Sequence, residues 1–283
     1  MWPWFRRPPQ ALARGSENDR TDEGMNGLAE RLYQVEIDNG TRKSARLAVV
    51  CYLWNETGFS DPRGFAPSHV NALARQVKDY LSLPYRFICI TDETTGFDDG
   101  IEVMPLPDEA RKAANVPTAQ GKERFPSCYR RLWTFSENAK VLGDVVLVLD
   151  IDCFIVSSLD PLFDFMPDAE FVGWNPLQAW GRTKVGGGTW RHCPGTRTHI
   201  WENFSQRDAL RIKGLGYNGS DQAILSYYLA DEPVFPQDWI LNRQDMRRLD
   251  GHAPAIAKIV HCNGPRAMKG FLKIDDVPWT GRR

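Results

Sequence analysis

Val145-Val-Leu-Val-Leu149-Asp150-Ile-Asp152-Cys-Phe-Ile-Val156 joins an unbroken aliphatic run to a pair of aspartates two residues apart. Five apolar residues precede Asp150, and Gly143-Asp144 bounds them on the other side. The pattern predicts a strand buried on both faces, as in a parallel sheet. Residues i and i+2 of a strand point the same way, so Asp150 and Asp152 are predicted to project together at the strand's end. Ligands of open α/β sheets bind at that edge.

The aspartate pair has two interpretations. Two hard oxygen ligands suit Mg²⁺ or Mn²⁺, and such ions bind through one or two carboxylates together with substrate phosphates. Carboxylates at strand ends also serve as turn or helix-cap residues. The pair by itself therefore leaves a metal site and a capping role equally open.

Composition restricts the class of protein. The 283 residues are 42% hydrophobic and 25% charged, as expected for one α/β domain or two small ones. A formal net charge of −1 gives no reason to expect a nucleic-acid partner. No run approaches the roughly 18 apolar residues of a membrane span, and the first residues lack a signal peptide's apolar core. We expect a cytoplasmic location, and the six separated cysteines predict free thiols.

The order of predicted elements indicates a parallel α/β sheet. Residues 1–28 are expected to form a disordered arm and 29–283 a single domain. A hairpin is possible across 32–37 and 46–54, the segment 185–189 is expected to be mobile, and Ser68 is a candidate N-cap. Strands are predicted over 46–54, 85–91, 101–105, 145–149 and 259–261, and helices over 68–81, 128–141, 198–205 and from 221. Such a sheet has a crevice at its carboxyl edge.

Five landmarks along the chain carry a resemblance to a known family. They are Asp150-Ile-Asp152, Leu159-Asp-Pro-Leu-Phe163, Gly186-Gly187-Gly188, Asp221-Gln222 and His261-Cys-Asn-Gly264. In this order they resemble the nucleotide-sugar-dependent glycosyltransferases of the GT-A fold, most closely family 8, the glycogenin and bacterial galactosyltransferase group. The resemblance covers roughly residues 46–270. It implies a GT-A-like α/β fold, with a central mostly parallel sheet flanked by helices.

The resemblance implies a metal-dependent hexosyltransferase. Asp150, Asp152 and His261 would bind one divalent ion, Mn²⁺ or alternatively Mg²⁺, and that ion would hold the diphosphate of a nucleotide sugar, a UDP-sugar in the first instance. An imidazole ligand argues for Mn²⁺ over Mg²⁺. The alternative for His261 is a strand-end histidine that only bonds a backbone group. Retention at the anomeric carbon is implied by the family, and the acceptor, whether saccharide, lipid or protein, is left open.

Further site residues follow from the same resemblance. Asp221 and Gln222 would contact the transferred sugar and the acceptor, although Ser220 or Asp221 could instead cap a helix. Arg131, counted with the catalytic residues, and Arg130 would neutralise the leaving diphosphate. Tyr52 and Trp54 could stack on the base or belong to the core. The remaining candidates for nucleotide contact are Ile151, Gly264, Arg266 and Lys269.

The sequence also departs from the family, and other classes remain open. Gly186-Gly187-Gly188-Thr189 stands where the family commonly has Asn or Ser, then Gly and an apolar residue, so donor-sugar contacts are not carried over. The glycine run is alternatively a lid over the nucleotide. A haloacid-dehalogenase-like phosphatase would need Thr or Val where Phe154 stands. A nucleotidyltransferase would need a glycine- and lysine-rich loop after the first strand, and a non-catalytic nucleotide-binding module of the same fold is a third alternative.

Overall fold

A central six-stranded sheet organises the chain in the computed structural model, which describes residues 37–38, 41–42, 46–54, 65–113, 126–176 and 182–262. The strand order is β5-β4-β3-β6-β9-β8. Strands β5, β4, β3 and β6 are parallel, whereas β9 is antiparallel to both of its neighbours. The strands are β3 (Leu47–Leu53), β4 (Arg86–Thr91), β5 (Ile101–Pro105), β6 (Val145–Leu149), β8 (Phe171–Gly173) and β9 (Thr189–His192). The expected α/β class with a mostly parallel sheet is confirmed.

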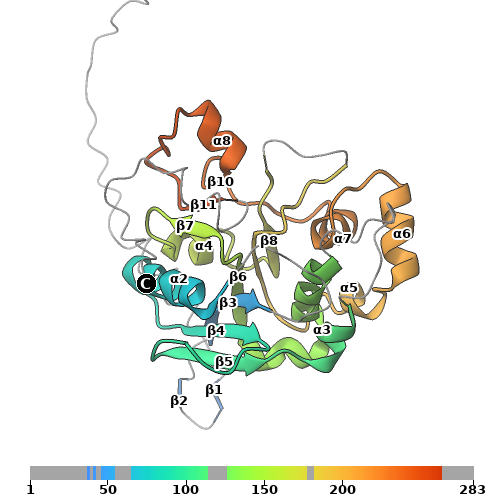
Figure 1. Cartoon of the computed structure of the whole chain (residues 1–283), viewed down its shortest axis with the longest axis horizontal. Coiled ribbons are helices and arrows are strands. Elements are labelled where there is room, and N and C mark those ends of the chain that lie inside the picture. The colour runs from blue at the N-terminus through green and yellow to red at the C-terminus, as the bar shows by residue number, and fades with distance from the viewer. Residues whose placement is uncertain are drawn as a thin grey trace, which may run out of the picture.

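Helices cover both faces of the sheet because its central strands are apolar at every position. All seven residues of β3 are buried. Alternate residues such as Val49 pack against α2 (Pro67–Tyr80) through Val70 and Leu73. Val50 instead belongs to the cluster formed by the 3₁₀ helix η1 (Pro126–Phe135) and by α7 (Asp221–Tyr228). Figure 1 shows α2 and α7 on opposite sides of the sheet.

A second, three-stranded sheet brings the end of the chain back to the aspartate pair. Its order is β10-β11-β7, with β7 (Cys153–Ile155), β10 (Ile240–Asn242) and β11 (Ile259–His261). Strand β7 follows Asp152 directly and pairs antiparallel with β11, so that His261 lies opposite Cys153. This pairing places a histidine far along the chain beside the predicted metal site.

The other elements connect these layers. Helix α8 (Arg243–Arg248) lies next to β10 (Figure 1), and Asn242 caps it by accepting hydrogen bonds from the amides of Gln244 and Asp245. No helix within the described ranges is long and apolar enough to cross a membrane. The remaining elements are β1 (Ile37–Asp38), β2 (Thr41–Arg42), α3 (Asp108–Ala113), η2 (Glu137–Leu142), α4 (Asp160–Asp164), α5 (His199–Glu202) and α6 (Gln206–Gly214).

Several predicted elements need correction. Helix α2 begins after Ala66, so Ser68 is not its N-cap. The segment 128–141 forms two 3₁₀ helices rather than one regular helix. The glycine run, expected to be mobile, is buried and leads into β9, a strand that the sequence did not predict. The possible hairpin of 32–37 with 46–54 is not seen, because the described Ile37 pairs with Arg42 of β2 and β3 pairs with β4 and β6. The 1–28 arm, residues 32–36 and residues 263–283 lie outside the described residues.

Candidate functional site

The carboxyl edge of the sheet collects the candidate residues. Strands β6 and β8 both run antiparallel to β9, so they end at the same edge, where β9 begins. Asp150 follows β6, Trp174 follows β8, and the glycine run immediately precedes β9. A hydrogen bond of 2.8 Å from the amide of Asp150 to the carbonyl of Gly188 joins two of these segments. This is the edge at which α/β folds bind their ligands.

Three predicted metal ligands meet at this edge. Asp150, Asp152 and His261 each offer a ligand atom, and these atoms all lie within 4.8 Å of one another. The amide of Cys262 donates to the carbonyl of Asp152 at 2.9 Å, which fixes the end of β11 against the aspartates. Two carboxylates and an imidazole form a donor set that could hold a divalent metal ion. The structure thus brings together all three residues that the sequence placed at a metal site.

His261 is held in the neutral state that metal ligation requires. Its ring is 3% exposed, stacks on Trp174 at 4.7 Å between ring centroids, and shares a 2.9 Å hydrogen bond between Nε2 and Oγ1 of Thr189. Burial, with a smaller contribution from the charge of Arg131, lowers the pKa of His261 to about 3. Nδ1 is buried without a hydrogen-bond partner among the described residues. The partner of Nε2 is thus a side-chain hydroxyl and not a backbone group.

Arg131 bridges two carboxylates at the site. It is paired through Nη1 with Asp150, and its Nη2 lies 2.5 Å from Oδ2 of Asp221. Burial opposes the charge of Arg131, but the carboxylates of Asp150 and Asp221 outweigh burial and raise the pKa of the guanidinium. The arginine therefore stays charged and holds the start of α7 against the end of β6. The predicted catalytic arginine and aspartate are in direct contact.

The two polar residues in the first turn of α7, Asp221 and Gln222, have different surroundings. Asp221 is buried and accepts a 3.1 Å hydrogen bond from the hydroxyl of Ser220. Burial raises the pKa of Asp221, whereas Arg131 opposes that shift. Gln222 is partly exposed, and its amide nitrogen lies 3.4 Å from the carbonyl of Asn218. Ser220 is the N-cap residue of α7, as one capping alternative states, but its side chain makes no capping hydrogen bond.

Each glycine of the run 186–188 leaves room for a different group of the site. A Cβ on Gly186 would meet the ring of Trp174 at 2.4 Å, and one on Gly188 would meet Cε1 of His261 at 2.6 Å. A Cβ on Gly187 would lie 3.1 Å from Oδ1 of Asp221 and 3.2 Å from Nη2 of Arg131. These positions take no left-handed backbone conformation in the structure, so the close approach is what excludes a side chain. The run is a packed wall of the site, and the interpretation as a lid is not needed to explain it.

The candidates for nucleotide contact divide into two groups. Trp54 is half-buried at the carboxyl end of β3, and the guanidinium of Arg130 lies over its ring at 5.4 Å. Tyr52 and Ile151 are buried within the two apolar clusters, as the core alternative for Tyr52 states. A half-buried ring with a cation beside it is better placed to stack on a base than a fully buried ring. Gly264, Arg266 and Lys269 lie outside the described residues.

Comparison with solved structures identifies the fold. Among solved structures, the chain is similar to the galactosyltransferase LgtC in complex with donor and acceptor sugar analogs, with a TM-score of 0.51 and 14% identity over 77% of this chain and 87% of LgtC. The chain has the GT-A-like fold of LgtC. A second LgtC structure, an active-site mutant with glutamate in place of glutamine, aligns with a TM-score of 0.52 and 13% identity over 77% of this chain and 88% of that one. No protein-family profile and no curated protein matches the sequence.

Two residues of the site were not predicted from the sequence. Thr189 bonds His261, and Trp174 stacks on its ring. The sequence carried a weak signal for Trp174, which follows the apolar Phe171-Val-Gly173, and none for Thr189, which follows three glycines. What it lacked was the pairing of β9 with β6, which alone brings Thr189 to the end of the aspartate strand.

Proposed function

We propose that this chain is a metal-dependent glycosyltransferase that moves a hexose from a UDP-sugar to an acceptor, with retention at the anomeric carbon. One observation carries the proposal: Asp150, Asp152 and His261 converge within 4.8 Å at the carboxyl edge of a sheet with the LgtC fold. The same fold supports many functions, so the chemistry of these residues, and not the fold, makes the argument.

The residues present fit a divalent ion. Two carboxylates supply hard oxygen donors, and the buried Nδ1 of His261 lacks a hydrogen-bond partner in the described part of the chain. An imidazole that stays neutral down to about pH 3 does not have to lose a proton before it binds a metal. Mn²⁺ held by these three residues would stabilise the charge that develops on the leaving diphosphate. Mg²⁺ is the weaker candidate, because it prefers oxygen ligands.

The neighbouring residues would position the two substrates. Arg131 supplies a fixed positive charge beside Asp150, where a diphosphate would lie. Asp221 is held by that arginine at the start of α7, and Gln222 follows it with a partly exposed amide. We assign Asp221 and Gln222 to contacts with the transferred hexose and the acceptor. Trp54 would stack on the uracil base, and Arg130, whose guanidinium lies over the Trp54 ring, would act with Arg131 on the leaving diphosphate.

The UDP-hexose donor and the retention at the anomeric carbon are proposed from the resemblance to family 8. The two LgtC structures are described as a complex with donor and acceptor sugar analogs and as a glutamine-to-glutamate mutant of the active site. The landmark order of family 8 favours a UDP-hexose and retention for this chain. Phe154 stands where a haloacid-dehalogenase-like phosphatase would need Thr or Val, which favours a glycosyltransferase, and the half-buried Trp54 at the end of β3 favours a nucleotide ligand.

A thermal-shift experiment tests the proposal. The chain is titrated with UDP, GDP, CDP and ADP, each with Mn²⁺ and with a chelator, because a ligand that binds the native state raises its apparent stability. We expect a shift for UDP that disappears with the chelator and in Asp150→Asn. Hydrolysis of a UDP-hexose by the parent would then separate an enzyme from a module that only binds nucleotide. The absence of any nucleotide shift would overturn the proposal.

A further inference from the structure

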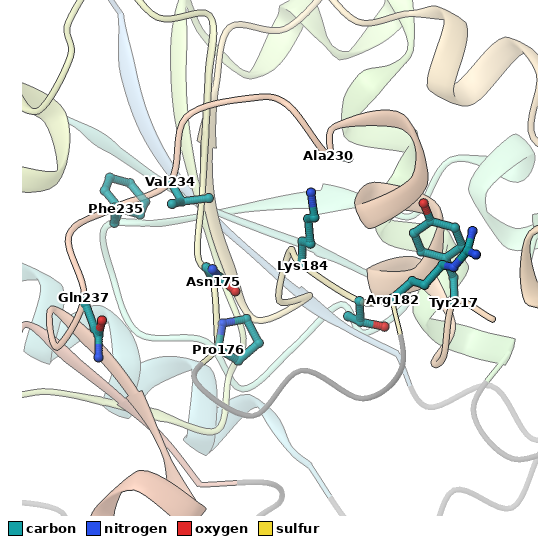
Figure 2. A pocket seen from close by; sticks show the side chains of 10 residues that line it. Asn175, Pro176, Arg182, Lys184, Tyr217, Ala230, Val234, Phe235 and Gln237 are labelled. Carbon is teal, nitrogen blue, oxygen red and sulfur yellow. The ribbon is translucent and has the colours of Figure 1, made fainter. Parts of the chain in front are cut away.

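A cavity of about 640 Å³, whose lining side chains Figure 2 shows, is bounded by the residues that follow Trp174 and by the residues that precede the glycine run. Its size is within the ~300–1,000 Å³ typical of small-molecule sites. The segments that wall it are the residues after β8, the residues before the glycine run, the loop before α7 and the chain after α7. The lining residues are Asn175, Pro176, Arg182, Thr183, Lys184, Tyr217, Ala230, Val234, Phe235 and Gln237.

Two walls of this cavity are continuous with the metal candidates. Trp174, which stacks on His261, is followed by Asn175 at the cavity. Lys184 precedes the run 185–188, whose glycines pack on the site groups. The sheet order places β3 with Trp54 on one side of Asp150 and β8 with this cavity on the other. The metal candidates therefore lie between the Trp54 end, assigned to the nucleotide, and the cavity.

Two cationic side chains line the cavity, Arg182 and Lys184. Arg182 and Lys184 are exposed, whereas Thr183 between them is buried, so that both cations line the same space. Figure 2 shows Lys184 between Asn175 and Pro176 on one side and Arg182 with Tyr217 on the other. None of the described lining residues is acidic, and neither cation has an ion pair within the described ranges. Such charges select an anionic ligand.

The backbone that presents these cations is fixed. The hydroxyl of Ser226 on α7 accepts from the amides of Lys184 and Val185 at 3.0 and 2.9 Å. The hydroxyl of Thr183 bonds the carbonyl of Asn218 at 3.1 Å, and the amide of Arg182 donates to the carbonyl of Gly216 at 3.1 Å. The charges are thus held on an ordered segment, as a binding site requires.

Uncharged groups complete the lining. Asn175 and Gln237 offer amide donors and acceptors of the kind that bind sugar hydroxyls. Tyr217 is packed edge-on against Tyr227 at 5.6 Å between ring centroids, which leaves its other surface to the cavity. An aromatic ring, two amides and two cations together fit a sugar that carries an acid group.

We propose that this cavity is the acceptor subsite and that it selects a saccharide bearing a carboxylate or phosphate, through Arg182 and Lys184. The assignment as an acceptor subsite rests on the proposed glycosyltransferase function. The selectivity for an anionic saccharide is a property of the cavity and can be measured separately.

Calorimetric titration of the full chain tests the proposal with three matched probes: cellobiose, cellobiouronic acid and cellobiose 6-phosphate. With UDP and Mn²⁺ present, at least one charged disaccharide is expected to bind about tenfold more tightly than cellobiose. Which of the two charged disaccharides binds more tightly distinguishes a carboxylate acceptor from a phosphate acceptor. Arg182→Gln and Lys184→Gln are each expected to weaken that binding about threefold to fivefold, the effect of losing one exposed ion pair. Arg207→Gln, which removes an exposed cation on α6 outside the cavity, is the matched control and should change nothing.

The possible outcomes separate the two proposals. Equal affinity for the three disaccharides, or a preference that survives the Arg182→Gln, Lys184→Gln double variant, would overturn the anionic acceptor. UDP affinity is measured in the same variants and should be unchanged, because neither cation is assigned to the nucleotide. If UDP fails to bind the parent while the charged disaccharide still binds and depends on both cations, the proposed function fails and the selectivity of the cavity stands.

Discussion

Replacing Gly188 with alanine should displace His261 and weaken metal binding without unfolding the chain. The new Cβ would lie 2.6 Å from Cε1 and 2.9 Å from Nδ1 of His261. Carbon atoms in contact are normally separated by about 3.5–4.0 Å, so one of the two groups must move by roughly 1 Å. Gly188 has no left-handed backbone conformation, and the alanine is penalised by this contact alone.

The histidine cannot move aside freely. Trp174 stacks on one face of its ring, Thr189 bonds Nε2, and β11 pairs with β10 on one side and β7 on the other. Overpacking a confined site of this kind costs about 1–3 kcal/mol. For a chain of this size, each kcal/mol lowers Tm by about 2–4 °C. A shifted ligand should also weaken metal binding about 10–100-fold, the usual effect of disturbing the groups that orient a metal ligand.

The assay compares Gly188→Ala with Gly214→Ala. Gly214 is the last residue of α6, and a Cβ there would meet nothing within 4 Å. Because alanine favours helices, Gly214→Ala should keep or slightly raise Tm, by the equivalent of at most about 1 kcal/mol. Tm and the Mn²⁺-dependent affinity for UDP are measured for both variants and the parent. If Gly188→Ala matches the parent in both measurements, the glycine run does not set the position of His261.

Three further outcomes follow from the same contacts. Burial lowers the pKa of His192 from 6.5 to about 4, so as the pH falls the unfolded state takes up the proton before the folded state does. The free energy of unfolding should therefore decrease by up to about 3 kcal/mol between pH 6.5 and pH 4. Denaturant titrations should show this decrease in the parent and not in His192→Gln, and identical pH profiles of the two proteins would contradict it. Arg131→Gln leaves Asp150 and the buried Asp221 without their shared cation. The free energy of unfolding in urea should decrease by about 3–5 kcal/mol, and a decrease below about 1 kcal/mol would refute the bridging role. Trp54→Ala should weaken UDP binding by about 1–3 kcal/mol, the usual contribution of one stacked base, and UDP binding should still depend on Mn²⁺. An unchanged UDP affinity in calorimetry would show that Trp54 is not part of the nucleotide site.

Local sequence patterns were sufficient for the centre of the sheet. The aliphatic runs at β3, β4 and β6 are buried on both faces, and such strands are recognised from composition without knowledge of their neighbours. Asp150 and Asp152 lie in the turn between β6 and β7 and not within a strand, so the predicted strand alternation does not apply to them, although their ligand atoms lie within 4.8 Å of each other. The position of the pair directly after a buried strand was predictable, and the turn that brings the two carboxylates together was not.

Tertiary contacts determine the parts that the sequence did not predict. Strand β9 contains Arg191, whose buried guanidinium donates to the carbonyls of Leu162, Phe163, Phe165, Met166 and Ala169 around α4. A charge in a four-residue segment gives no strand signal, because strand preference depends on the neighbouring strands. The glycine run likewise indicates mobility in isolation and becomes a packed wall only where Trp174 and His261 fill the space beside it.

The contacts of Arg131 with Asp150 and Asp221 also depend on tertiary structure and could not be predicted from the sequence. Arg131 belongs to a 3₁₀ helix, Asp150 to the end of β6 and Asp221 to the first turn of α7. No spacing in the sequence relates these positions. The family resemblance named the three residues, but their contact depends on how η1 and α7 pack on the same face of the sheet.

The most direct test of the account is a titration of Mn²⁺ followed by electron paramagnetic resonance, with UDP, for the parent and for Asp152→Asn. The signal of free Mn²⁺ decreases as the ion binds, so the measurement reads the metal itself and does not depend on turnover. One ion should bind per chain in the parent, more tightly when UDP is present, and Asp152→Asn should lose at least tenfold in affinity. Equal Mn²⁺ binding by the two proteins, or no binding by the parent, would contradict a metal site at Asp150, Asp152 and His261.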